Sequence, residues 1–80
     1  MNVKIYVTLK TGVLDPQGKA VKHSLETLGF KEVADVRVGK FIELKFSDGL
    51  PKADAEARVK EMCEKLLANT VVESYRIELA

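Results

Sequence analysis

The chain is poor in the residues that usually build catalytic and metal sites. Its 80 residues include one cysteine, one histidine and no tryptophan. A single cysteine excludes a disulfide within the chain and fits a reducing compartment. One histidine and one cysteine are also too few for a zinc site. We expect Cys63, on the apolar side of a predicted helix, to be a core residue and His23 to be a solvated surface residue, so the sequence offers no evident catalytic centre.

An excess of charge of one sign and long hydrophobic runs are missing as well. With 13 basic and 12 acidic residues the net charge is +1, which argues against nucleic acid or an anionic membrane as the main partner. No apolar run approaches the roughly 18 residues of a membrane span, and no signal-peptide pattern opens the chain. We predict a soluble, cytoplasmic protein with a single domain over residues 1–80, near the lower size limit for a self-sufficient core.

Hydrophobic periodicity is the main positive signal. Apolar and polar residues alternate over 2–10, which predicts a strand with one buried face. Helical spacing predicts a helix over about 16–29 and a second one that begins near Pro51, and a last strand follows over about 71–79. The predicted fold class is α+β, a β-α-β-α-β two-layer sandwich related in shape to ferredoxin-like domains. Its sheet is mainly antiparallel, with two helices on one face and a long bent central strand.

That long strand is residues 33–46, where the even positions are mostly apolar. A hairpin turn at Gly39-Lys40 would rotate Glu43 and Lys45 toward the core, so the pattern favours one continuous strand, bent at Gly39. Fourteen residues at about 3.3 Å each span roughly 46 Å, and one end must overhang so small a domain. An overhanging strand with an apolar face needs another chain to cover it. The length therefore predicts oligomerisation.

Residues 11–21 are the least generic run. Asp15 and Pro16 predict a helix start, because the carboxylate caps the first turn and proline lacks the amide that would be unpaired there. Gly18 costs roughly 0.5–1 kcal/mol in that turn, which indicates close approach by another surface or is incidental. A phosphate site is disfavoured, since Asp15 puts a negative charge at the helix start. For Lys40 two interpretations stay open, an amine in water beyond the core and a contact to a partner.

These stretches together resemble a known family. The runs Lys10–Val21, Leu28-Gly29-Phe30, Val36–Lys40 and Cys63–Asn69 are similar to the signature of the small subunit, PurS, of phosphoribosylformylglycinamidine synthase. The resemblance covers essentially the whole chain, with Thr70 where it leads us to expect proline. It implies a role in purine biosynthesis, in a complex that converts formylglycinamide ribonucleotide, glutamine and ATP to formylglycinamidine ribonucleotide, glutamate, ADP and phosphate.

The resemblance further implies a non-catalytic assembly subunit, a dimer or a dimer of dimers, that joins a glutaminase subunit to a large synthetase subunit and helps ammonia pass between them. No activity is expected of the subunit alone, no cofactor is expected on it, and ATP and Mg belong to the large subunit. The alternative is a regulatory domain that senses an amino acid or nucleotide at a subunit boundary. The candidates for partner contact are Thr11, Gly12, Gln17, Gly18, Lys19, Arg37, Gly39 and Lys40.

Overall fold

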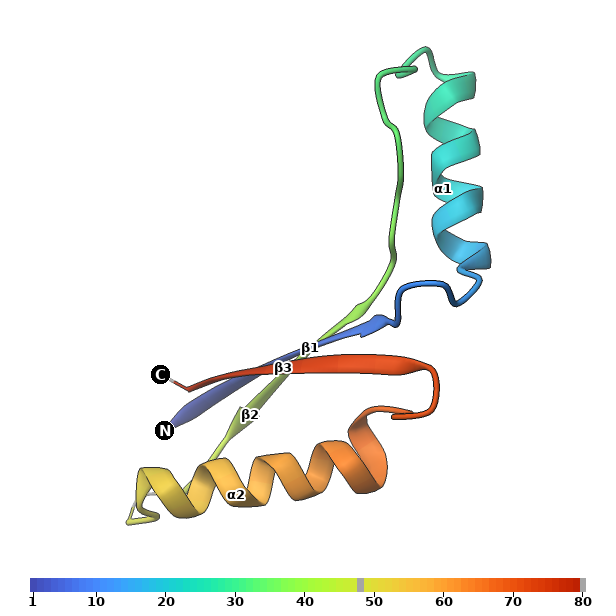
Figure 1. The fold of residues 1–80 in the computed structure, drawn as a ribbon. Helices are drawn as coiled ribbons and strands as arrows, with labels where there is room; N and C mark the ends of the chain where they lie inside the picture. The colour runs from blue at the N-terminus through green and yellow to red at the C-terminus, as the bar shows by residue number, and fades with distance from the viewer. Residues whose placement is uncertain (48, 80) are drawn as a thin grey trace.

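The computed structural model describes residues 1–47 and 49–79. Figure 1 shows the elements in chain order, and they confirm the predicted α+β class and the β-α-β-α-β order. They are β1 (Asn2–Leu9), α1 (Pro16–Thr27), β2 (Lys40–Lys45), α2 (Lys52–Met62), the π-helical turn η1 (Cys63–Leu67) and β3 (Glu73–Leu79).

The sheet is antiparallel with the strand order β2-β1-β3. Ile5 in the central strand lies opposite Ile42 on one side and Ile77 on the other. The alternation predicted for the first strand is confirmed, because Val3, Ile5 and Val7 are buried under α2 and η1, and Leu9 at its end is half-buried. This core consists of Val3, Ile5, Val7, Val59, Cys63 and Ala68.

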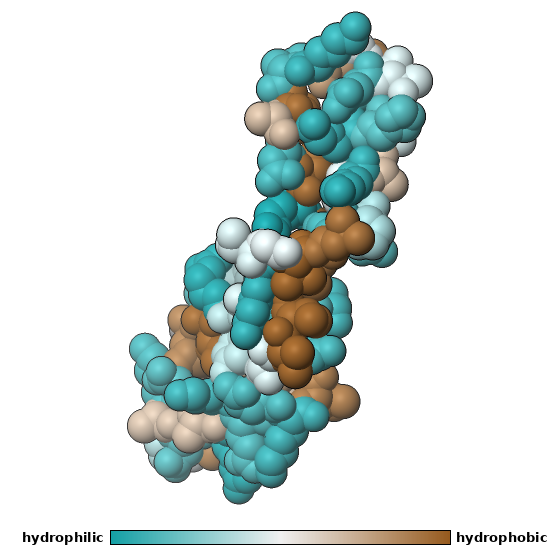
Figure 2. Space-filling view, turned by 45° about the vertical axis from the view of Figure 1, so that its right-hand side comes forward, coloured by the Kyte–Doolittle hydropathy of each residue, from teal (hydrophilic) through white to brown (hydrophobic). Residues whose placement is uncertain are grey.

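Residues 16–39 form an arm that stands away from the sheet, with α1 lying beside the extended residues 33–39 (Figure 1). We call residues 1–9, 40–47 and 49–79 the body. The arm gives the molecule a length of 51 Å and a radius of gyration of 16.2 Å, against about 12 Å for a compact chain of this size. Apolar side chains of the arm, among them Val21, Leu28 and Phe30, are exposed. Figure 2 accordingly shows apolar residues reaching the surface in both arm and body.

Two details of the predicted sheet were wrong. The long strand over 33–46 is neither central nor paired along its length: only Lys40–Lys45 pairs, and it does so as the edge strand β2, while β1 is central. The predicted absence of a hairpin at Gly39 is confirmed, since the chain runs on from β2 into the arm (Figure 1). Residues 33–39 go beyond the end of the sheet, so the described chain gives them no neighbouring strand.

The same continuation moves the first helix. Both helices were expected on one face of the sheet, but only α2 and η1 lie there (Figure 1). Residues 33–39 continue past the end of the sheet without a turn. Because α1 runs alongside these residues, it also lies beyond the sheet. The last strand also begins at Glu73 and not near 71, because a turn precedes it in which the Val72 and Glu73 amides donate to the Asn69 carbonyl.

Candidate functional site

The arm joins the body at a junction that is organised by Asp15. One carboxylate oxygen accepts from the Gly18 amide at 2.9 Å, which caps α1 as predicted. The other oxygen accepts from the Val38 amide at 3.0 Å, far along the chain. These two amide hydrogen bonds, Gly18 first, hold the pKa of the Asp15 carboxyl below its usual value. One side chain thus ties the helix start to the extended side of the arm.

Arg37 fixes the arm to the end of the central strand. Its guanidinium donates to the carbonyls of Leu9 and Lys10, the second at 3.2 Å. The Lys10 amide in turn donates to the Val72 carbonyl at 2.8 Å. Hydrogen bonds therefore join three stretches of chain: the end of β1, the extended side of the arm and the turn that precedes β3.

Two glycines allow backbones to come close together, one within the arm and one between the arm and β1. A Cβ on Gly18 would lie inside van der Waals distance of the Val36 carbonyl oxygen, and one on Gly39 would collide in the same way with the Val7 carbonyl. The close approach predicted at Gly18 is confirmed, and the approaching surface belongs to the same chain. Because any side chain would push the backbones apart, Gly18 sets how closely the two sides of the arm can pack and Gly39 sets how closely the arm can approach β1.

An open cleft of about 320 Å³ runs along the junction. It brings together three of the residues predicted to contact a partner, Gly12, Lys19 and Arg37, whereas Thr11, Gln17 and Lys40 are exposed outside it. Lys40 lies 3.8 Å from the Glu73 carboxylate, with its amine largely in water. Whether the eight predicted residues contact a partner stays a prediction. The full lining of the cleft is Gly12, Val13, Leu14, Asp15, Lys19, Asp35, Val36 and Arg37.

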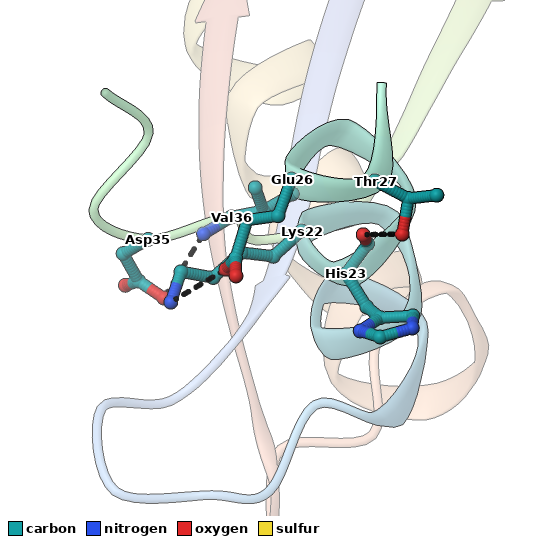
Figure 3. A network of polar contacts seen from close by, with 6 residues as sticks. All are labelled: Lys22, His23, Glu26, Thr27, Asp35 and Val36. Atoms are coloured by element: carbon teal, nitrogen blue, oxygen red, sulfur yellow. Dashed lines mark hydrogen bonds and ion pairs between the residues drawn. The ribbon is translucent and has the colours of Figure 1, made fainter. Parts of the chain in front are cut away.

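The lone histidine and cysteine lie where the sequence predicts. Figure 3 shows the exposed His23 ring on α1, apart from Asp35 and from the Lys22–Glu26 ion pair at 3.3 Å. The only polar contact drawn at His23 goes to its backbone carbonyl, from the Thr27 hydroxyl. Cys63 is fully buried in the core, and this burial raises the pKa of its thiol. Both predictions are confirmed, and neither side chain belongs to the junction.

Within residues 1–47 and 49–79, no three His, Cys, Asp or Glu side chains gather closely enough to hold a metal ion. The helices of this described part are also too short and too polar to cross a membrane. Sequence reasoning missed the tie that Asp15 makes between the two sides of the arm and the tie that Arg37 makes between the arm and the end of β1. The Asp-Pro pair signals the cap on α1, but no local pattern signals the bonds to Val38, Leu9 and Lys10.

Fold and junction define a small α+β domain with a projecting helix-and-strand arm. Comparison with known proteins gives it a family: a family model described as phosphoribosylformylglycinamidine (FGAM) synthase, PurS, matches residues 2–80, and the chain belongs to the PurS family. The PurS subunit of Bacillus subtilis (strain 168) is 56% identical over 77 residues, which cover 96% of this chain and 89% of that protein. The Synechocystis PurS subunit is 47% identical, covering 95% and 75% of the two chains.

Solved structures agree with the sequence comparison. The B. subtilis PurS structure superposes with a TM-score of 0.86 at 56% identity, over 96% of this chain and 94% of that one. A chain in the structure of PurLQS from Thermotoga maritima superposes with a TM-score of 0.83 at 32% identity, over 98% and 96%. The function expected from the resemblance, a subunit of FGAM synthase in purine biosynthesis, is confirmed.

Proposed function

We propose that this chain is a non-catalytic assembly subunit of FGAM synthase. As a homo-oligomer it joins the glutaminase subunit to the ATP-dependent synthetase subunit and supports transfer of ammonia between them. The similarity to a chain in PurLQS from T. maritima supports these partners. ATP and Mg then act on the large synthetase subunit in the cytoplasm, and this subunit holds neither.

The observation that carries the proposal is the arm. Leu28 is 72% exposed and Phe30 49% exposed, although both are large apolar residues. Leaving such side chains in water forfeits about 1.5–3 kcal/mol each relative to full burial. A surface of this kind is typical of a chain that other chains complete, and not of a self-contained enzyme. When a second copy of this chain covers the arm, the charged cleft at the junction stays accessible to a different subunit.

The eight predicted contact residues extend this proposal to the junction. Lys19 lines this cleft with Gly12 and Arg37, and its exposed amine offers a cationic group to a partner carboxylate. An exposed charge at the edge of an interface mainly sets the rate and orientation of docking. We therefore place the contact with the glutaminase or synthetase at this cleft.

Reconstitution tests the proposal. The three subunits are mixed, and synthesis of formylglycinamidine ribonucleotide is measured with glutamine and, separately, with ammonia supplied directly. We expect omission of this chain to abolish the glutamine-dependent reaction much more than the ammonia-dependent one. Full glutamine-dependent activity without this chain would end the proposal.

A matched pair of charge reversals locates the contact. Lys19→Glu changes an exposed residue of the cleft, and Lys52→Glu changes an exposed residue at the start of α2. Lys19→Glu should lower glutamine-dependent synthesis severalfold at limiting concentrations of this subunit, whereas Lys52→Glu should not. Equal effects of the two variants would remove the cleft from the contact surface.

A further inference from the structure

The sheet face opposite α2 carries a row of aromatic and cationic side chains. Because Ile5 of β1 is buried under α2 and η1, its neighbours along the strand point to the other face (Figure 1). There Tyr6 lies directly opposite Phe41 of β2 on one side and Arg76 of β3 on the other. We call Phe41, Tyr6 and Arg76 the aromatic row. Phe41 is 51% exposed and the Arg76 side chain is 68% exposed, so the row is open to solvent.

The three side chains of the row are stacked against one another. The ring centroids of Tyr6 and Phe41 are 5.1 Å apart, and the Arg76 guanidinium lies 4.2 Å from the centroid of the Tyr6 ring. Both distances are typical of attractive aromatic and cation–π contacts. The Tyr6 hydroxyl also donates to the Glu78 carboxylate at 3.3 Å. Because these contacts restrict the side chains in advance, the row loses little conformational freedom when a partner binds.

The composition of the row indicates what it can bind. Aromatic residues and arginine are enriched at the centres of protein interfaces, where their truncation costs the most binding energy. The Arg76 guanidinium is 3.7 Å from Glu78, an ion pair longer than a hydrogen bond. Its N–H groups can therefore still donate to a carboxylate from outside. The row thus fits a protein surface that presents apolar side chains around a carboxylate.

The neighbouring charges argue against two other occupants. Lys4, the next residue of β1 on this face, lies opposite Glu43 on one side and Glu78 on the other. These two carboxylates border the row and would repel the phosphates of a nucleic acid. A second copy of the same face offers Arg76 no free carboxylate, because Glu78 accepts from Tyr6 and Glu43 lies opposite Lys4.

A chain that joins two different proteins needs two surfaces that do not overlap. The cleft at the junction, which the proposed function assigns to one of them, is lined by residues 12–15, 19 and 35–37. The aromatic row lies on the three strands of the body and shares no residue with that cleft. The other face of the same sheet is occupied by the core under α2 and η1. The open sheet face is therefore available to the second protein.

We propose that the aromatic row is the docking surface for one of the two subunits, glutaminase and synthetase, that this chain joins, and that the cleft contacts the other. The docked subunit packs apolar side chains on Phe41 and Tyr6 and places a carboxylate at Arg76. The inference rests on the proposed function and deepens it by giving the two contacts separate surfaces.

Thiol labelling of the reconstituted three-subunit complex tests whether this face is covered. Ser74 is exposed on β3, two residues from Arg76 and on the same face, whereas the native Cys63 is buried. Maleimide should label Ser74→Cys at least about tenfold more slowly in the complex than in the free chain, because an interface excludes solvent. The matched control Ala57→Cys, exposed on α2, should be labelled equally fast in both.

Two results of the labelling would overturn the proposal. One is an equal labelling rate of Ser74→Cys in the complex and in the free chain. The other is protection of Ser74→Cys that grows with the concentration of the free chain, which would assign the face to a second copy.

Substitutions in the row test which subunit docks there. In sedimentation of the mixed subunits, Arg76→Glu should weaken retention of one subunit at least about tenfold, and Lys19→Glu should release the other. Phe41→Ala removes the apolar end of the row without a change of charge and should release the same subunit as Arg76→Glu. The matched reversal Arg58→Glu, at an exposed position of α2, should release neither. Circular dichroism of each free variant confirms that it is folded.

The possible failures are distinguishable. Retention of both subunits by folded Arg76→Glu and Phe41→Ala would overturn the docking surface. Release of the same subunit by Arg76→Glu and Lys19→Glu would overturn the separation of the two contacts. Glutamine-dependent synthesis that does not require this chain would instead overturn the proposed function.

Discussion

The arm and the body are built from the same kinds of sequence, yet only the body has an interior. Each contains a helix with an apolar stripe and an extended segment in which apolar and polar residues alternate. In the body, Val59 of α2 and Cys63 of η1 are fully buried against the sheet. In the arm, Val21 is 42% exposed and Leu28 is 72% exposed. Periodicity decides which side chains share a face, and topology decides whether anything lies opposite that face.

The two regions also differ in what holds them. The body is held by apolar packing over three strands, α2 and η1. Hydrogen bonds of the partly exposed Asp15 join the two sides of the arm, and those of the exposed Arg37 join the arm to the end of β1. Regions with few buried contacts open at lower free energy than a packed core. In an isolated chain the arm should therefore loosen well before the body unfolds.

The largest expected effect comes from the core of the body. Ile5→Ala removes a fully buried side chain and should lower the free energy of unfolding by about 2–5 kcal/mol. Leu28→Ala in the arm should change it by less than about 0.5 kcal/mol at concentrations where the chain is monomeric. Urea unfolding followed by circular dichroism, with the mass checked by sedimentation, measures both values.

An equal loss for Leu28→Ala in the monomer would break the comparison, because it would show that the arm is packed within one chain. A loss that appears only as the protein concentration rises would sharpen it. Such a result means that Leu28 becomes buried in the oligomer.

Much of the body could be predicted from local pattern. The alternation over residues 2–10 is sufficient to assign the buried face of β1, and the stripe through Val59 and Cys63 assigns the buried face of α2 and η1. The Asp15-Pro16 pair predicts the start of α1 because both of its effects act within one turn. The absence of a hairpin at Gly39 also followed from pattern, since a turn there would bury charged residues.

The position of the arm could not be predicted in the same way. The stripe on α1 indicates that the helix covers something, but not whether it covers its own sheet or another chain's. Likewise, the bond from the Val38 amide to Asp15 joins residues far apart in sequence, and nothing local requires it. Apolar periodicity is equally compatible with a helix that covers its own sheet and with a helix that another chain covers.

A smaller effect is expected at the contact between α1 and the extended residues of the arm. Gly18→Ala should destabilise the arm by about 1–3 kcal/mol, because the new methyl group collides with the Val36 carbonyl. The gain in helix propensity, about 1 kcal/mol at most in a helix interior, does not offset this. Gln17→Ala, an exposed neighbour in the same turn, should change little and serves as the control. Amide exchange should show loss of protection in the arm with the body intact. If Gly18→Ala protects the arm better than the parent chain, the helix term outweighs the collision.

The smallest effect should come from acid, and it separates the two regions within one molecule. Hydrogen bonds from the Gly18 and Val38 amides lower the pKa of Asp15. Its contribution to stability is therefore complete above the ordinary aspartate pKa of about 4 and is lost as the pH falls through the lowered pKa of the folded arm. Protection of the Gly18 and Val38 amides, corrected for intrinsic exchange, should fall from pH 6 to pH 2 while that of Ile5 in β1 persists. Asp15→Asn should already show reduced protection at pH 6 and respond less to acid, because the neutral amide has one acceptor oxygen where the carboxylate has two. If Ile5 loses protection together with Gly18, arm and body open as one unit, and the difference between them is one of surface and not of stability.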